Sequence, residues 1–231
     1  RLLDGLNELD WSDSIKEARK LREGAFELTA ETDAGALGVE IAALTDDAIA
    51  SNAYAAEAVM LYIREHRRDL LHGPFVLMGF SAGSLVTPAA AARLRQMNEP
   101  PELSAVVLVG AGADLFLLSQ KSTLTDGGVT IKDGKKRPSR ARIEEVHQAY
   151  RRAVRLDPCV SAEQLRTTPV LQVHATRDDW VPHEGGDILY EALGKPDRLA
   201  VRAGHIRLFY TLGLYADRIA DWVGEKAPEA R

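Results

Sequence analysis

The sequence contains a single cysteine, Cys159, so an internal disulfide is excluded. One cysteine also excludes a cysteine-rich metal site, because such sites need several thiolates at short spacings. Cys159 lies in the stretch LDPCVSAEQL, where a small, half-buried apolar role is favoured over that of a nucleophile. The remaining residues give little support for a metal site, and we expect neither a metal nor another cofactor.

Long apolar runs are also missing, since none reaches the roughly 20 residues that a membrane-spanning helix needs. No part of the first thirty residues resembles a signal peptide. We therefore expect a soluble protein without a membrane partner, and a cytoplasmic location is favoured. The net charge of −5 provides no general attraction to nucleic acid or to anionic membranes. Residues 132–142 are locally basic, which is typical of a solvated loop.

The sequence does have enough apolar residues, 45% of 231, to bury the core of one large domain. Four short runs rich in valine and leucine are typical of strands buried on both faces of a parallel sheet. They are residues 75–80, 105–109, 170–175 and, more weakly, 199–202. Helical segments separate them, so the sequence predicts an α/β fold with a mostly parallel sheet and flanking helices.

Further elements are predicted between and before these strands. A capping pattern predicts a helix over residues 14–24, followed by a strand at 26–30 and a turn in DAGALG at 33–38. Apolar residues at helical spacing predict a long helix that starts at Thr45 and is stopped by Gly73 and Pro74. A small hairpin around residues 129–131 and an amphipathic helix over 140–156 complete the expectation.

Ser81 stands between two glycines in FVLMGFSAGSLVTPAAAARL, where a predicted strand turns into a predicted helix. So sharp a turn requires a strained positive φ at the serine, and side chains at Gly79 and Gly83 would collide with the strand and the helix. The hydroxyl then projects above the edge of the sheet. The backbone amide of Ala82, at the helix N-terminus, is placed to donate a hydrogen bond to an oxyanion. The pattern predicts that Ser81 is a nucleophile.

A serine nucleophile needs a histidine base, and that imidazole needs a carboxylate to hold its tautomer. Asp178 and Asp179 follow the predicted strand 170–175 in TRDDWVP, and His205 follows the strand 199–202 in AGHIRLFY. The order Ser, Asp, His leaves room between the three positions for the intervening strand and helix units. Either aspartate is a candidate for the acid on these grounds.

These stretches together resemble the α/β-hydrolase family, and the resemblance covers most of the chain from about Asp10 onward. GFSAG is similar to the family's nucleophile elbow, DDWVP to its acid loop of the form Asp-x-x-Val-Pro, and AGH to its histidine loop. The resemblance implies that Ser81 is the nucleophile, Asp178 the acid and His205 the base. The family spacing to Val-Pro favours Asp178 over Asp179.

The resemblance also implies how the chain is divided. Residues 1–231 would form one α/β-hydrolase domain, and residues 113–168 a lid insertion whose basic stretch favours acidic or polar substrates. The family's oxyanion loop after its central third strand is not present. RLLDGLNELDW resembles the tail of that loop, so Leu2 or Leu3, with Leu3 chosen, would supply the second oxyanion amide. We expect the natural protein to continue upstream of Arg1.

The function implied is that of a serine hydrolase, without a cofactor, that cleaves a small carboxylic ester through an acyl-enzyme. An amide substrate is the alternative bond, and peptidase or haloperoxidase-like activities use the same triad. The alternative of another class is a catalytically silent fold that serves as a binding module.

Overall fold

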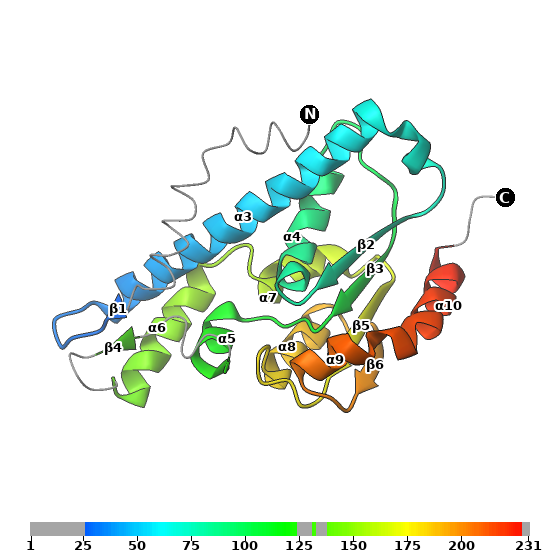
Figure 1. Cartoon of the computed structure of the whole chain (residues 1–231). Coiled ribbons are helices and arrows are strands. Elements are labelled where there is room, and N and C mark those ends of the chain that lie inside the picture. The colour runs from blue at the N-terminus through cyan, green and yellow to red at the C-terminus, as the bar shows by residue number, and fades with distance from the viewer. Residues whose placement is uncertain (1–25, 124–130, 133–137, 228–231) are drawn as a thin grey trace.

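The computed structural model describes residues 26–123, 131–132 and 138–227. Within them, four parallel strands form a sheet in the order β2-β3-β5-β6 (Figure 1). These strands are β2 (Phe75–Phe80), β3 (Leu103–Val109), β5 (Val170–Ala175) and β6 (Asp197–Val201). The predicted α/β fold with a parallel sheet is confirmed. β2 and β5 have the predicted bounds, whereas β3 and β6 begin before the predicted residues.

Helices cover both faces of this sheet, which explains why its strands are largely apolar. In β3, Val106 and Leu108 face one side, and Val107 and Val109 face the other. The first side is covered by α4 (Ala82–Arg95), α7 (Pro158–Ser161), η2 (Ala162–Leu165) and α8 (His183–Ala192). The second is covered by α9 (His205–Thr211), η3 (Leu212–Tyr215) and α10 (Ala216–Lys226).

The longest helix, α3 (Ala34–His66), begins well before Thr45, so the predicted start of the helix is wrong. The predicted turn at residues 33–38 is wrong as well, because DAGALG forms the cap and first turn of α3. The Asp33 carboxylate accepts hydrogen bonds from the backbone amides of Gly35 and Ala36, as an N-cap does. The helix ends at His66, before the predicted stop at Gly73, and the short helix η1 (Arg68–Leu71) follows it.

Gly38, which lies in the predicted turn, instead allows α3 and another helix to approach closely. The predicted amphipathic helix is present as α6 (Arg140–Ala153), and it lies beside the first half of α3 (Figure 1). A Cβ atom at Gly38 would lie 2.8 Å from the backbone nitrogen of Tyr150 in α6. Only glycine fits this crossing without moving one of the helices.

A second, two-stranded sheet pairs β1 (Phe26–Glu27) in parallel with β4 (Ile131–Lys132). The predicted hairpin around residues 129–131 lies mostly outside the described residues, and its described residue, Ile131, pairs with Phe26, far away in the sequence. The predicted strand at residues 26–30 is shorter than expected. The predicted helix over residues 14–24 lies outside the described residues.

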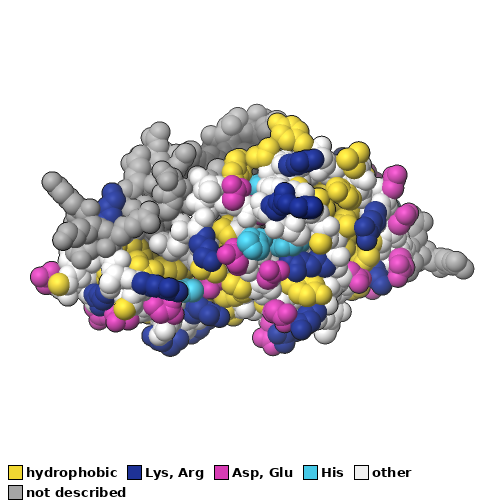
Figure 2. All heavy atoms as spheres, turned by 90° about the horizontal axis from the view of Figure 1, so that it is seen from below, with side chains coloured by type: hydrophobic (Ala, Val, Ile, Leu, Met, Phe, Trp, Pro, Cys, Tyr) yellow, Lys and Arg dark blue, Asp and Glu magenta, His cyan; other side chains and the backbone are white. Residues whose placement is uncertain are grey.

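The segment 113–168 runs between β3 and β5. Its described part contains α5 (Leu115–Lys121), β4, α6, α7 and η2, and α6 packs on α3 rather than on the sheet. On the face of the molecule shown in Figure 2, basic and acidic side chains are interspersed. In the part of the chain that the structure describes, no helix has both the length and the apolar character needed to cross a bilayer.

Candidate active site

The backbone at Ser81 adopts the strained conformation that the sequence predicts. Ser81 has φ 49° and ψ −120° and stands between the end of β2 and the first residue of α4. Its amide donates a hydrogen bond to the carbonyl of Val109 on β3, at 2.9 Å. Positive φ in a residue other than glycine costs free energy, and such strain gathers at functional sites. The turn therefore presents the Ser81 hydroxyl at the C-terminal edge of the sheet.

The two glycines beside Ser81 differ in their surroundings. A Cβ atom at Gly79 would lie 2.7 Å from the Cα atom of Ser84 and would also collide with the Thr87 hydroxyl. The expected steric demand is therefore confirmed at Gly79. At Gly83 the expectation is wrong, because an added Cβ atom meets nothing within 4 Å. The helix leaves the turn in a direction that opens the space around its second residue.

The structure brings Ser81, His205 and Asp178 together from three separate strand ends. Ser81 Oγ lies 2.8 Å from His205 Nε2, and His205 Nδ1 lies 2.7 Å from Asp178 Oδ2. A carboxylate only accepts hydrogen bonds, so the proton of a neutral imidazole belongs on Nδ1. Nε2 is then an acceptor that faces the Ser81 hydroxyl. His205 and Asp178 are only 3% and 5% exposed, which shields the pair from water.

The Asp178 carboxylate is fixed by its own loop. Its Oδ1 atom accepts hydrogen bonds from the backbone amides of Trp180 and Val181, at 3.0 and 2.8 Å. Oδ2 is thereby directed at the imidazole of His205. Asp179, the alternative acid, is exposed, and its described hydrogen bonds go from Thr123 to its backbone carbonyl. Of the two aspartates, Asp178 is the one that contacts His205.

Two aromatic rings enclose the His205 imidazole. Trp180 stacks on it with a centroid distance of 5.4 Å and an interplanar angle of 26°, and Phe209 contacts it edge-on at 5.0 Å. Both rings limit how far the imidazole can rotate away from Ser81. The sequence analysis did not assign a role to either residue. The place of Trp180 between Asp178 and Val181 is the signal that points to it.

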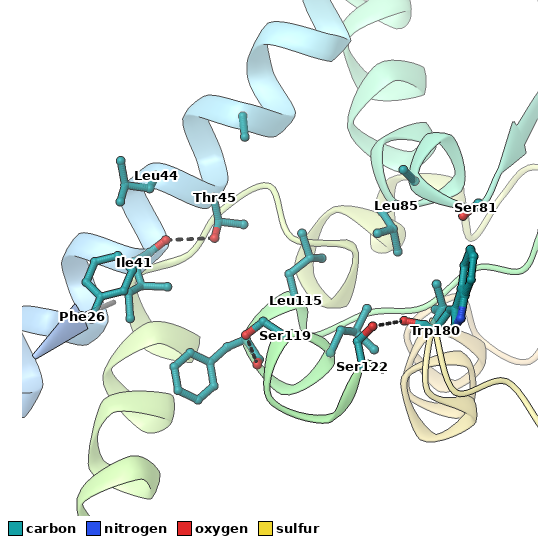
Figure 3. A pocket seen from close by; sticks show the side chains of 15 residues that line it. Phe26, Ile41, Leu44, Thr45, Ser81, Leu85, Leu115, Ser119, Ser122 and Trp180 are labelled. Carbon is teal, nitrogen blue, oxygen red and sulfur yellow. Dashed lines mark hydrogen bonds between the residues drawn. The ribbon is translucent and has the colours of Figure 1, made fainter. Parts of the chain in front are cut away.

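A cavity of about 370 Å³ opens beside Ser81 (Figure 3). α4 contributes Leu85, α5 contributes Leu115, and the acid loop contributes Trp180, whose ring also stacks on His205. The far end is walled by Ile41 of α3 and Phe26 of β1. The described lining contains no charged side chain. Residues 133–137 of the basic stretch lie outside the described residues, so the basic rim that would select acidic or polar substrates stays a prediction.

Of the oxyanion donors named from the sequence, the structure describes Ala82 and does not describe Leu2 or Leu3. Ala82 is the first residue of α4 and also lines the cavity. The first amides of a helix have no acceptor within the helix, so the Ala82 amide needs an acceptor from outside α4. Leu2 and Leu3 lie outside the described residues.

A second histidine forms a similar carboxylate contact away from Ser81. His147 Nε2 of α6 lies 2.8 Å from both carboxylate oxygens of Asp114, and its ring stacks on Phe116. Asp114 adopts a left-handed conformation with φ 63° and caps α5 by accepting from the amide of Leu117. The pair thus ties α6 to the start of α5.

The other reactive residue types have environments that suit structural roles. Burial is the main cause that lowers the pKa of His174 to about 4, and a Cβ atom at Gly186 would lie 2.5 Å from its Nδ1 atom. Burial also raises the pKa of the Cys159 thiol, which keeps it protonated at neutral pH. Among the described residues, no group of three or more metal-ligating side chains is found.

Comparison with known proteins gives the fold and leaves the activity open. The chain is similar to the structure of an esterase from Pyrococcus furiosus, with a TM-score of 0.50 and 13% identity. The match covers 74% of this chain and 59% of that one, so the chain spans less than two thirds of the esterase's length. The chain has an α/β-hydrolase fold. An identity of 13% shows the fold alone.

Two weaker likenesses have TM-scores below 0.5, too low to support the assignment. A puromycin-hydrolysing peptidase from Mycobacterium tuberculosis gives 0.45 at 18% identity, over 66% of this chain and 22% of that one. A lipase-esterase related protein from Clostridium acetobutylicum gives 0.44 at 16% identity, over 74% of this chain and 75% of that one. The sequence matches no family model, and a search of curated proteins finds no match.

Proposed function

We propose that this chain is a serine hydrolase that cleaves a carboxylic ester through an acyl-enzyme, with an amide as the alternative bond. The observation that carries the proposal is the pair of hydrogen bonds in series, 2.8 Å from Ser81 Oγ to His205 Nε2 and 2.7 Å from His205 Nδ1 to Asp178 Oδ2. A hydroxyl, an imidazole and a carboxylate in this order form the arrangement that nucleophilic acyl transfer needs.

In the first half of the reaction, Ser81 Oγ attacks the carbonyl carbon while His205 Nε2 accepts the hydroxyl proton. Asp178 stabilises the imidazolium that forms and keeps Nδ1 protonated. The Ala82 amide donates to the oxygen on which negative charge develops, and Leu3 is proposed as the second donor. His205 then returns its proton to the departing alcohol, whose bond to carbon breaks.

The second half of the reaction releases the acid. Water attacks the carbonyl carbon of the acyl-enzyme, and His205 accepts a proton from this water. His205 then donates the proton to Ser81 Oγ as the ester bond to Ser81 breaks. The segment 113–168 is proposed as the lid of this site. The place of α5 supports that role, since Leu115 and Phe116 wall the cavity beside the nucleophile.

The test is turnover of p-nitrophenyl butyrate by the wild-type chain and by the Ser81→Ala variant. We expect the variant to lose about 10⁴-fold or more in kcat, because without the hydroxyl no acyl-enzyme forms. Equal turnover by both proteins, or no turnover by a folded wild-type chain, would contradict the proposed function. Thermal melts of both proteins verify that the variant is folded.

A further inference from the structure

The cavity beside Ser81 is uncharged along its whole described lining. α3, α4 and α5 contribute aliphatic side chains, and the acid loop contributes an indole ring and a valine. Burying a charged group in such surroundings costs several kcal/mol unless a partner of opposite charge is present. The described walls offer no such partner, so a group that enters the cavity gains free energy by being apolar.

The hydroxyl groups in the walls do not change this chemistry. Thr45 Oγ1 donates to the carbonyl of Ile41 at 2.9 Å, and Ser119 Oγ donates to the carbonyl of Phe116 at 2.7 Å. Ser122 Oγ donates to the carbonyl of Trp180. Each of these three hydroxyl groups therefore donates its proton to a backbone carbonyl. The hydrogen-bond donors that serve the reaction lie at the end of the cavity that contains Ser81.

The position of the cavity relative to the base indicates which half of the ester it holds. The departing alcohol must lie beside His205 Nε2 in order to receive its proton. In the described lining, Ser81 is the one member of the Ser-His-Asp set, and Ala82 is its neighbour there. His205 itself does not belong to the described lining, although Trp180, which stacks on its ring, does. The cavity therefore starts at the nucleophile and the oxyanion amide. The alcohol lies on one side of the carbonyl carbon, and the acyl chain lies on the other.

We infer that the cavity is an acyl pocket and that the substrate is an ester of an uncharged hydrocarbon acid of medium chain length. The inference rests on the serine hydrolase function proposed above, and it names the substrate class of that site. Figure 3 shows the lining residues along which such a chain would lie, from Ser81 past Leu85 and Leu115 to Ile41, Leu44 and Phe26.

The size of the effect follows from the burial of methylene groups. Each methylene that enters an apolar site raises kcat/KM about fourfold at most. Six additional methylenes, from acetyl to octanoyl, are therefore expected to raise kcat/KM about 100-fold or more when part of the chain stays outside. A cavity of about 370 Å³ has room for a chain of this length.

The first experiment compares p-nitrophenyl acetate, butyrate and octanoate below their aggregation limits. We expect kcat/KM to rise with acyl length and to fall at least tenfold when the octanoyl chain ends in a carboxylate, since the pocket then holds a charge. A second series keeps the acetyl group and lengthens the alcohol, and kcat/KM should change little. A flat acyl series, equal rates for the carboxylate-ended ester, or a larger effect of alcohol length would overturn the inference.

A variant of the pocket wall locates the chain. Ala48 of α3 lines the pocket but is exposed, so Ala48→Phe places a ring in the pocket without overpacking a buried core. We expect it to lower the ratio of octanoate to acetate kcat/KM by about tenfold or more. Ala43→Phe is the matched control, because Ala43 is exposed on the same helix and does not line the pocket. An unchanged ratio in a folded Ala48→Phe protein would contradict the acyl path along α3.

A failure of this inference is distinguishable from a failure of the proposed function. If acetate turnover depends on Ser81 but the acyl series is flat, the serine hydrolase proposal stands and the acyl pocket is wrong. If no ester is turned over and a small fluorophosphonate does not label Ser81, the proposed function itself is wrong. Thermal melts of Ala48→Phe and Ala43→Phe identify any variant that fails to fold.

Discussion

Two regions of the molecule contain an aspartate within hydrogen-bond distance of a histidine. In one of these regions, the histidine also faces the hydroxyl of Ser81. At the sheet edge, His205 Nδ1 lies 2.7 Å from Asp178, which leaves Nε2 to meet Ser81 at 2.8 Å. Between α5 and α6, His147 places its Nε2 atom 2.8 Å from both oxygens of Asp114. In the second pair, Nε2 of the histidine contacts the carboxylate. In the first pair, the same nitrogen faces the serine.

The comparison teaches that a buried carboxylate and imidazole do not make a catalytic site by themselves. Asp178 accepts from the amides of its own loop and orients a ring whose other nitrogen is directed at a strained nucleophile. Asp114 caps α5, and His147 joins that cap to α6. The first pair has the arrangement that the proposed proton transfer requires, and the second links α5 to α6.

Of the changes to the two pairs, removing the charge of the Asp178 carboxylate should have the largest effect on kcat. Asp178→Asn is expected to lower kcat by about 10³- to 10⁴-fold, because an amide favours the wrong imidazole tautomer. Asp179→Asn is the matched control and is expected to keep kcat within about tenfold, since Asp179 is exposed and does not contact His205. Turnover of p-nitrophenyl butyrate measures both, and equal losses would reverse the assignment of the acid.

A third histidine, His174, sharpens the comparison, because burial is the main influence on its pKa. The pKa of His174 is lowered to about 4, below the ordinary value near 6.5, so the unfolded chain binds this proton more strongly. The free energy of unfolding should therefore fall by about 2 to 3 kcal/mol as the pH drops from 6.5 to 4.5.

Urea melts at pH 7 and pH 4.5 isolate the contribution of His174. In His174→Gln the difference between the two free energies of unfolding should shrink by about 2 kcal/mol, because the replacement does not titrate. His72→Gln, at an exposed position, should keep the full difference. A difference that is the same in His174→Gln and in the wild type would remove His174 as the cause.

Breaking the contact between His147 and Asp114 should lower the free energy of unfolding and leave kcat nearly unchanged. His147→Ala leaves the carboxylate of Asp114, which is 1% exposed, without its histidine partner, and we expect a loss of about 1 to 3 kcal/mol in the free energy of unfolding. His147→Gln, which can still donate to Asp114, should restore part of it. For p-nitrophenyl acetate, kcat per folded molecule should stay within about fivefold. A loss as large as that of Asp178→Asn would abolish the distinction between the two pairs.

Most of the sheet could be predicted from the sequence, because strands buried on both faces are continuous apolar runs. The runs at Phe75–Phe80 and Val170–Ala175 coincide with β2 and β5. The start of α3 was missed because Gly35 and Gly38 indicate a turn when only local preferences are considered. Gly38 is instead required by the contact with α6, more than a hundred residues later in the chain. The parallel pairing of β1 with β4 is equally non-local and left no local pattern.

The candidate triad was accessible to sequence reasoning, because each member follows directly on a strand within a short motif. The steric role of Gly79 and the positive φ of Ser81 followed from the same motif, whereas the open space at Gly83 depends on the direction in which α4 leaves the turn. The pocket could not be predicted, since its walls come from α3, α5 and the acid loop. The apolar lining therefore appears only once these segments are placed around Ser81.

The most direct test of the central claim is covalent labelling of the chain by a small fluorophosphonate, read by intact mass and peptide mapping. The account predicts one adduct per wild-type molecule, located on Ser81, and none in Ser81→Ala. Ser51→Ala, which removes an exposed serine of α3, should label like the wild type. Full labelling that persists in Ser81→Ala, or a folded wild-type chain that takes up no label, would contradict the claim that Ser81, His205 and Asp178 form a working triad.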